Sequence, residues 1–400
     1  MPGSEFAEFE QRLNRPVSEK LVEFETDYRL HHLIFAKQLT PALLEELRRS
    51  ADVIRKLSRS PTGANLLRKL LSHKRAMLYF TQPSTRTFLS FMAACQILGL
   101  TCNEVRDPKT SSEVKRESPM DSIRMFSSYF DVIIMRSQKP NYAECCAYLM
   151  NDLMQRGKRW VPIINGGAGS DEHPTQALLD VYTILRTFEF GDRDPNEKSR
   201  YLELKAHYPS LIPGPEGKTY AFCGDIGRGR TVKSLATVLA KYADVRMFFI
   251  APDHPQLKMD RSLRGELTDA KVPFYEFNTL DAVHEGMPIL DQVDCLYMTR
   301  IQREHNTPSV EAEIAEIDFS HFCLSLPRLA RLRSYVPIMH PFPRDSEMNE
   351  IPTSIDNDPR VMYFRQARNG MWARASLLVH IFKLENQLHA LSLDLDLGGK

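Results

Sequence analysis

Residues 76–99 read AMLYFTQPSTRTFLSFMAACQILG and hold the stretch that decides the fold. Residues 76–80 form a short apolar run bounded by charged and polar residues, which predicts a buried strand. After residues 84–87 the apolar side chains recur at helical spacing, and Gly99 stands where a helix C-cap is expected. The sequence therefore predicts a strand, a turn rich in hydroxyl groups and then a helix.

The turn Ser84-Thr85-Arg86-Thr87 predicts an anion site. Unpaired backbone N–H groups at the helix N-terminus, the hydroxyl groups and the guanidinium of Arg86 would converge on one ligand. The alternative is that Ser84 only caps the helix and that Arg86 faces solvent. Polar residues at the ends of the other predicted strands favour the anion site.

Composition narrows the class of protein. A chain of 400 residues with 42% hydrophobic and 26% charged residues is typical of a globular protein with two domains. The net charge of +1 gives no electrostatic reason to expect nucleic acid or a membrane as partner. Seven cysteines without a C-x-x-C pair suit neither a metal site nor a disulfide framework, so we expect a cytoplasmic protein. No apolar leader and no long apolar run is present, so neither export nor membrane insertion is expected.

Five further apolar runs predict buried strands, and each is followed by polar groups. These runs span residues 132–135, 161–164, 219–223, 295–298 and 336–339. The groups that follow them are Arg136; His173 and Gln176; Arg230; Arg300 and Gln302; and the backbone of Pro341 and Phe342. Strands that alternate with helices in two blocks predict an α/β fold of two parallel-sheet domains with an active-site cleft between them. For any one of these residues taken alone, a surface arginine or a structural histidine is the alternative.

The arginines at the strand ends favour a ligand with several negative charges. The sequence shows no paired carboxylates, no Ser-His-Asp spacing, no H-E-x-x-H and no Walker A loop, so hydrolytic, zinc and ATP chemistry lack support. The glycine turn 224–231 does not fit G-x-G-x-x-G, which argues against a dinucleotide site.

We predict the following organisation. Residues 1–29 form an extension that covers the body or is partly disordered, and residues 30–188 form the first domain. Thr40 and Pro41 should open an amphipathic helix in that domain. Residues 189–365 form the second domain with an insertion at about 190–215, and a long helix from about 366 to 391, within residues 366–400, returns to the first domain.

Five motifs in this order resemble one family. They are S-T-R-T (84–87), H-P-T-Q (173–176), G-R-T-V-K-S (229–234), L-Y-M-T-R-I-Q (296–302) and H-P-F-P-R (340–344). Their order and spacing are similar to those of aspartate carbamoyltransferases, in the aspartate/ornithine carbamoyltransferase superfamily, over roughly residues 30 to 385. The resemblance implies transfer of the carbamoyl group of carbamoyl phosphate to L-aspartate in early pyrimidine synthesis, without a metal or cofactor.

The resemblance also implies a role for each matching residue. The residues implied to bind the phosphate are Ser84, Thr85, Arg86 and Thr87. Arg136, His173 and Gln176 are implied to bind the carbamoyl group. Thr87, Arg136 and His173 are implied to polarise its carbonyl oxygen. Aspartate binding falls to Arg230, Arg300 and Gln302, and to the carbonyls of Pro341 and Phe342 beside a cis Phe342–Pro343 bond. Ser111 and Lys115 match groups that a neighbouring subunit donates to the substrates, which implies a homotrimer with shared sites and leaves room for regulatory or dihydroorotase partner chains.

Two alternatives stay open beside this interpretation. The acceptor could be another amine such as ornithine, although the ornithine branch lacks the T-R-I-Q arginine. The chain could also be a non-catalytic paralogue that serves as an assembly subunit. Departures from the family pattern occur at Gln82, Phe88, His305, Phe342 and Arg368. Gln82 and His305 stand where many members carry a Glu and an Arg that pair across the domains, so this contact is expected to be neutral or to be made differently.

Overall fold

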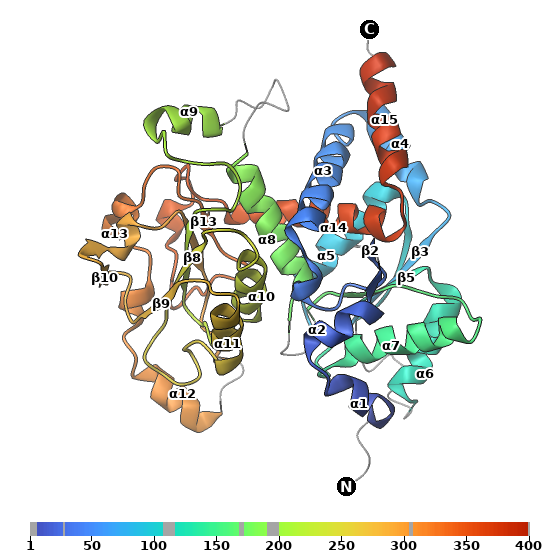
Figure 1. Cartoon of the computed structure of the whole chain (residues 1–400), viewed down its shortest axis with the longest axis horizontal. Helices are drawn as coiled ribbons and strands as arrows, with labels where there is room; N and C mark the ends of the chain where they lie inside the picture. The colour runs from blue at the N-terminus through green and yellow to red at the C-terminus, as the bar shows by residue number, and fades with distance from the viewer. Residues whose placement is uncertain are drawn as a thin grey trace. The chain divides into compact units, whose positions relative to one another are not determined.

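The computed structural model describes residues 6–26, 29–106, 117–167, 172–189, 200–303 and 307–398. The chain divides into two compact units, each taken by itself below (Figure 1). Unit 1 comprises Met1–Leu179 and Arg368–Lys400, and unit 2 comprises Asp180–Ala367. The chain passes from one unit to the other inside α8 (Pro174–Thr187) and again inside α14 (Tyr363–Ile381).

The described part of unit 1 contains a four-stranded parallel sheet in the order β4-β3-β5-β6. Its strands are β3 (Arg75–Phe80), β4 (Thr101–Val105), β5 (Val132–Arg136) and β6 (Ile163–Asn165). Its helices before the crossing are α1 (Glu10–Leu13), α2 (Val17–Lys20), α3 (Pro41–Leu57), α4 (Pro61–Leu70), α5 (Thr85–Leu98), α6 (Pro119–Tyr129) and α7 (Tyr142–Gln155). A short antiparallel pair, β1 (Glu25–Thr26) and β2 (Arg29–Leu30), lies outside this sheet.

Local signals in unit 1 act as the sequence predicts. The Thr40 hydroxyl accepts from the N–H of Leu43 and caps α3. Gly99 ends α5 with φ of +88°, and a Cβ there would lie 1.8 Å from the carbonyl oxygen of Arg68. Only glycine fits such a position, because a side chain would clash with backbone as well as strain the left-handed conformation. The predicted strand, turn and helix around residues 84–87 are confirmed.

The N-terminal segment packs against α7. Phe24 is fully buried, and Phe9 lies in the same apolar cluster as the sheet residues Tyr79 and Met135. A buried ion pair joins Lys20 Nζ to a Glu144 carboxylate oxygen at 2.7 Å. The described residues 6–26 therefore cover one face of unit 1.

The C-terminal segment corrects one prediction. Instead of one long helix, α14 ends at Ile381 and α15 (Glu385–Gly398) begins after a break. Lys383 adopts φ of +59°, and the Leu384 N–H donates to the carbonyl of Val379, as in a helix C-terminus that reverses the chain. The break turns α15 so that it packs against α3 and α4 (Figure 1).

The described part of unit 2 contains a five-stranded parallel sheet in the order β13-β12-β7-β8-β9. Its strands are β7 (Thr219–Cys223), β8 (Arg246–Ile250), β9 (Phe274–Phe277), β12 (Cys295–Met298) and β13 (Ile338–Met339). The helices of this unit between the crossings are α9 (Arg200–His207), α10 (Arg230–Leu239), α11 (Arg261–Asp269), α12 (Pro308–Ala315) and α13 (Leu326–Arg331). A hairpin is formed by β10 (Val283–His284) and β11 (Met287–Pro288).

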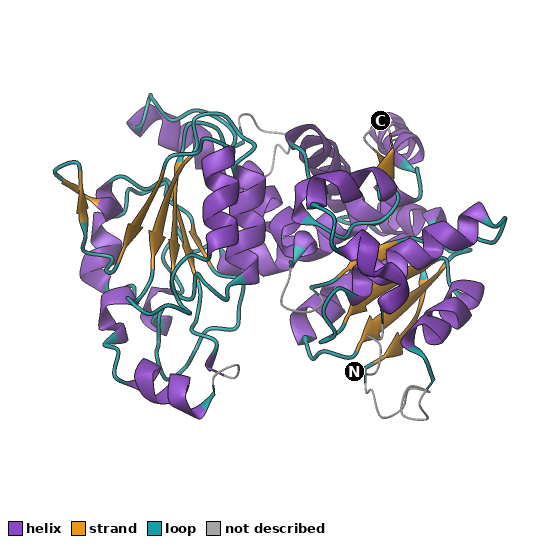
Figure 2. Cartoon of the chain, turned by 60° about the horizontal axis from the view of Figure 1, so that its bottom comes forward, coloured by secondary structure: helices purple, strands orange, loops and turns teal. Residues whose placement is uncertain are grey.

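Both sheets are parallel and flanked by helices, as predicted from the alternating pattern (Figure 2). Because parallel strands end at the same edge of a sheet, the polar residues that follow them share that edge. Within the described residues, no helix combines the length and apolar character needed to span a membrane.

Candidate active site

In unit 1, three neighbouring strands bring their exits together. The register pairs Phe80 of β3 with Arg136 of β5, and Met135 of β5 with Asn165 of β6. The turn after β3 is also fixed to the end of β5, because the Gln82 N–H donates to the Arg136 carbonyl at 3.2 Å. The predicted phosphate turn, Arg136 and the glycine loop (Gly166 and Gly167, directly after β6) therefore leave the sheet at one edge.

The S-T-R-T turn opens α5. Ser84 holds the N-cap backbone position, and the Phe88 N–H donates to the Ser84 carbonyl at 3.2 Å. Among the described residues, the Ser84 side chain makes no capping hydrogen bond, so the interpretation that it serves as a side-chain cap is wrong. Thr85 and Arg86 are exposed at the helix N-terminus and Thr87 is buried. This is the arrangement of backbone N–H groups, hydroxyls and a guanidinium that suits a phosphate.

Arg136 and His173 converge on the backbone of Gly167. A Cβ at Gly167 would lie 2.7 Å from an Arg136 guanidinium nitrogen and 2.8 Å from Cδ2 of the His173 ring. Arg136 donates to the Gly166 carbonyl at 3.3 Å, and the Gly167 N–H donates to Oδ1 of Asn165 at 2.8 Å. The glycine loop lets two side chains from separate elements reach one point.

His173 stands at the start of α8. Its carbonyl accepts from the N–H groups of Gln176 and Ala177, so the residue occupies the N-cap position through its backbone. The ring is buried, and its Nδ1 lies 3.5 Å from the hydroxyl of Thr175. The Gln176 side chain is buried in the first turn of the same helix. Helix geometry therefore fixes His173 and Gln176 relative to each other.

In unit 2, a buried aspartate holds together the turns after β7 and β12. The Asp225 N–H donates to Oγ1 of Thr299 at 3.0 Å, and its carboxylate accepts from the Gln302 N–H at 3.1 Å. The same carboxylate accepts from Nε of Arg228 at 2.9 Å. Asp225 is not among the residues predicted from the sequence, although a carboxylate directly after a strand and a glycine was a visible signal.

These two turns carry the predicted aspartate ligands. Arg230 is the first residue of α10, and Arg300 follows β12 with one guanidinium nitrogen 3.2 Å from the carbonyl of Ile301. Gln302 donates its side-chain N–H to the carbonyl of Arg228 at 3.2 Å. Since β7 and β12 are neighbours in the sheet, the residues that follow them share one edge of unit 2.

The turn after β13 lies at the same edge. Phe342 has φ of +58°, and the Phe342–Pro343 peptide bond is cis, as the resemblance implies. The Phe342 N–H donates to Nδ1 of His340 at 2.8 Å, so the ring proton of His340 resides on Nε2. This Nε2 lies 3.0 Å from the buried carboxylate of Glu350. The turn that carries the carbonyls of Pro341 and Phe342 is thus held by side chains from outside it.

Other predicted residues are not placed by the structure. Ser111, Lys115 and His305 lie outside the described residues. Phe88, one departure from the family pattern, is buried with the guanidinium of Arg106 4.5 Å from its ring centre. Each of the seven cysteines lies within the described residues and is a free thiol.

A cavity at the opposite edge of the unit 2 sheet, where β7 and β8 begin, is separate from these residues. It has a volume of about 650 Å³ and is lined by Lys218, Thr219 and Arg246 among others. Burial lowers the pKa of Lys218 to about 8, and its ammonium donates to the Ile212 carbonyl at 2.8 Å. A buried ammonium that donates to a backbone carbonyl is typical of a lysine with a structural role, so we assign that role to Lys218.

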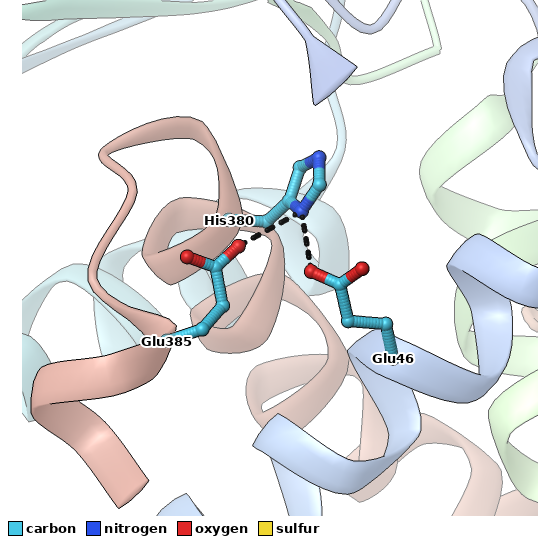
Figure 3. A group of neighbouring side chains, drawn as sticks. All are labelled: Glu46, His380 and Glu385. Carbon is cyan, nitrogen blue, oxygen red and sulfur yellow. Dashed lines mark hydrogen bonds and ion pairs between the residues drawn. The ribbon is translucent and has the colours of Figure 1, made fainter. Parts of the chain in front are cut away.

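A cluster of Glu46, His380 and Glu385 in unit 1 has the composition of a metal site (Figure 3). His380 Nδ1 lies 3.1 Å from a Glu46 oxygen and 3.0 Å from a Glu385 oxygen. However, the Leu30 N–H donates to the other ring nitrogen at 3.3 Å, so Nδ1 carries the ring proton. A metal would need the lone pair of that nitrogen. The cluster is therefore a hydrogen-bonded junction between Leu30, α3, α14 and α15.

The two halves of the chain match the two domains of one family. Residues 31–186 match the carbamoyl-P binding domain of the aspartate/ornithine carbamoyltransferase family, and residues 216–381 match its Asp/Orn binding domain. The chain is 34% identical to the aspartate carbamoyltransferase catalytic subunit of Vibrio cholerae, over 87% of this chain and 95% of the relative. It is also 34% identical to the chloroplastic aspartate carbamoyltransferase of Arabidopsis thaliana, over 88% of this chain and 77% of the relative.

A solved structure gives the same result. It is an aspartate transcarbamoylase from Trypanosoma cruzi in complex with carbamoyl phosphate and aspartate, with 29% identity and a TM-score of 0.70. The match covers 88% of this chain and 96% of that chain. The family models, the curated relatives and the solved structure together cover both sheets and both sets of strand exits. The chain therefore belongs to the aspartate/ornithine carbamoyltransferase family.

Proposed function

We propose that the chain is an aspartate carbamoyltransferase, which converts carbamoyl phosphate and L-aspartate into N-carbamoyl-L-aspartate and phosphate. The observation that carries the proposal is the meeting of Arg136 and His173 over the backbone of Gly167, at the edge where the S-T-R-T turn opens α5. Two hydrogen-bond donors beside a phosphate site are what a carbamoyl oxygen needs as it gains negative charge. The product would enter early pyrimidine synthesis.

The reaction follows from these groups without a protein nucleophile. The α-amino nitrogen of aspartate forms a bond to the carbonyl carbon, and Arg136, His173 and Thr87 stabilise the oxyanion. The bond from that carbon to the phosphate oxygen then breaks, and Ser84, Thr85 and Arg86 hold the departing phosphate. The proton released by the amine goes to the phosphate. Most of the acceleration would come from orienting two anions that repel each other and from fixed donors at the oxyanion.

The acceptor is assigned to aspartate because of the residues after β7 and β12. Arg230 and Arg300 present two guanidinium groups, and Gln302 is fixed between their turns by Asp225 and Arg228. Two carboxylates suit these arginines, whereas the cationic side chain of ornithine would be repelled. Relatives named aspartate carbamoyltransferase support the same acceptor.

An acceptor screen tests the function directly. The purified chain is incubated with carbamoyl phosphate and either L-aspartate or L-ornithine, and products are identified by mass. Carbamoyl transfer to aspartate alone is expected. Transfer to ornithine without transfer to aspartate would overturn the choice of acceptor, and no transfer to any amine by a folded chain would favour the non-catalytic alternative.

We also propose that the active unit is a homotrimer in the cytoplasm, with Ser111 and Lys115 of one chain completing the site of its neighbour. Inactive Lys115→Ala chains mixed with inactive Arg86→Ala chains should then regain part of the activity, because some sites receive both intact residues. Mixed trimers without any activity would contradict shared sites. Regulatory or dihydroorotase partner chains stay a prediction, which co-purification of the tagged chain from its native cells would test.

A further inference from the structure

A buried chain of hydrogen bonds in unit 2 ends at the turn after β13. The His340 N–H donates to Oε1 of Gln366 at 2.9 Å, and Nε2 of Gln366 donates to a carboxylate oxygen of Asp180 at 2.6 Å. The other Asp180 oxygen accepts from the hydroxyl of Tyr297 at 2.8 Å. Asp180 is 0% exposed, and Gln366 and His340 are each 1% exposed.

The order of donors and acceptors along these hydrogen bonds is fixed by the groups at both ends. A backbone N–H can only donate, so it selects the oxygen of the Gln366 amide, and an ionised carboxylate can only accept, so it selects the nitrogen. A glutamine between these two groups therefore has one allowed orientation. Burial and the Asp180 carboxylate also raise the pKa of Tyr297, which keeps its hydroxyl a donor.

His340, the first residue of the turn, depends on Gln366. The backbone N–H of His340 donates to Gln366, while the His340 ring accepts from the Phe342 N–H at 2.8 Å. The ring and the backbone of His340 are thus both held, and Pro341 lies between the two fixed points. Loss of the Gln366 oxygen would leave the buried His340 N–H without its partner, which is unfavourable unless the turn moves.

We infer that Gln366 is a positioning residue for the acceptor amine, and that Asp180 orients it. This inference rests on the proposed function, in which the carbonyls of Pro341 and Phe342 direct the attacking amine. Neither Gln366 nor Asp180 touches substrate in this scheme. They act through the backbone of His340, and a shift of about 1 Å in such a turn can lower the rate roughly 10²-fold.

The test replaces Gln366 with methionine, which has a similar length and no hydrogen-bonding amide. The expected result is a kcat about 10²-fold lower, with an unchanged dissociation constant for carbamoyl phosphate because the phosphate turn lies in unit 1. The matched control is Gln292→Met. Gln292 is another buried glutamine of unit 2, and its amide donates to the carbonyls of His284 and Met287 at 2.9 Å each. It should lose stability but keep its kinetic constants.

A polarity reversal gives a second, sharper test. Gln366→Glu alone places two carboxylates face to face. They share a proton at low pH, but at high pH both are ionised and repel each other, so kcat should be lowered at high pH. Adding Asp180→Asn restores the hydrogen bond between positions 180 and 366 with donor and acceptor exchanged, because the asparagine N–H can donate to the glutamate. The glutamate still accepts from the His340 N–H. At high pH, where both carboxylates of Gln366→Glu are ionised, the double variant should be more active than Gln366→Glu. A double variant with no recovery, or Gln366→Met with the wild-type kcat, would overturn the inference.

Hydrogen exchange separates this inference from the proposed function. The peptide that spans residues 338–344 should exchange faster in Gln366→Met than in wild type or Gln292→Met. If the wild-type chain carries no carbamoyl group to aspartate, the proposed function falls, and unchanged exchange in Gln366→Met would overturn the positioning role independently. Faster exchange together with lower kcat supports both.

Discussion

Replacing Gly167 with alanine should lower kcat about 10²-fold, because the added methyl group would stand where Arg136 and His173 meet. The new Cβ would lie 2.7 Å from a guanidinium nitrogen of Arg136 and 2.8 Å from Cδ2 of His173. Non-bonded atoms prefer separations of about 3.5–4.0 Å, so each side chain must retreat by nearly 1 Å. A displacement of that size at reacting groups typically costs about 10²-fold in rate.

The same substitution also strains the backbone, and a control separates the two effects. Gly167 has φ of +95°, where a residue with a side chain costs about 1–2 kcal/mol. Gly157 has φ of +70° and a Cβ there would meet no described heavy atom within 4 Å, so Gly157→Ala tests strain without displacement.

Both variants are compared by kcat at saturating carbamoyl phosphate and aspartate, and by urea unfolding. Gly157→Ala should lose stability and keep its activity. A folded Gly167→Ala enzyme with wild-type kcat would refute the convergence of the two side chains as the source of catalysis. Equal losses of activity in the two variants would instead trace the effect to backbone strain.

Three further predictions concern single side chains. His173→Ala should lower kcat by about 10²–10³-fold with native circular dichroism; a near-normal kcat in steady-state assays would argue against its role at the oxyanion. Lys20→Met should destabilise the chain by about 3–5 kcal/mol in urea unfolding, since it leaves the Glu144 carboxylate buried without its cation, and Glu144→Gln in the same chain should recover part of the loss. Burial alone would raise the pKa of Glu385, but hydrogen bonds from His380 and Arg29 lower it to about 2. The stabilisation that the ionised Glu385 gives is therefore complete above about pH 4.5 and lost as the pH falls toward 2. Glu385→Gln should lower the Tm at pH 7 more than at pH 3. An equal loss of Tm at the two pH values would contradict the lowered pKa of Glu385.

The sequence predicted the elements whose signal is local. Apolar runs located β3, β5 and β7, and Thr40 and Gly99 marked helix ends that the structure confirms. The polar residues at the strand exits could also be found, because a parallel sheet places the carboxyl ends of its strands together whatever the loops contain.

Features that depend on distant contacts could not be predicted in this way. β4 (TCNEV) is an edge strand with mostly exposed side chains, so it carries no apolar run. The break at Lys383 lacks glycine or proline, and it is accompanied by hydrogen bonds of the His380–Glu385 junction to Glu46 and Arg29. The sequence shows two neighbouring glycines at 166–167, but only the coordinates show how closely Arg136 and His173 approach Gly167.

Because the chain leaves unit 1 inside α8 and returns inside α14, unit 2 is continuous in sequence whereas unit 1 is not. On the ribosome, where synthesis proceeds at about 5–20 residues per second, residues 180–367 can fold as soon as they emerge. Unit 1 must wait for residues 368–400, and until then the surfaces of α3 and α4 that α15 covers stay exposed. A nascent chain that stops within residues 368–400 would therefore contain all of unit 2 and an unfinished unit 1.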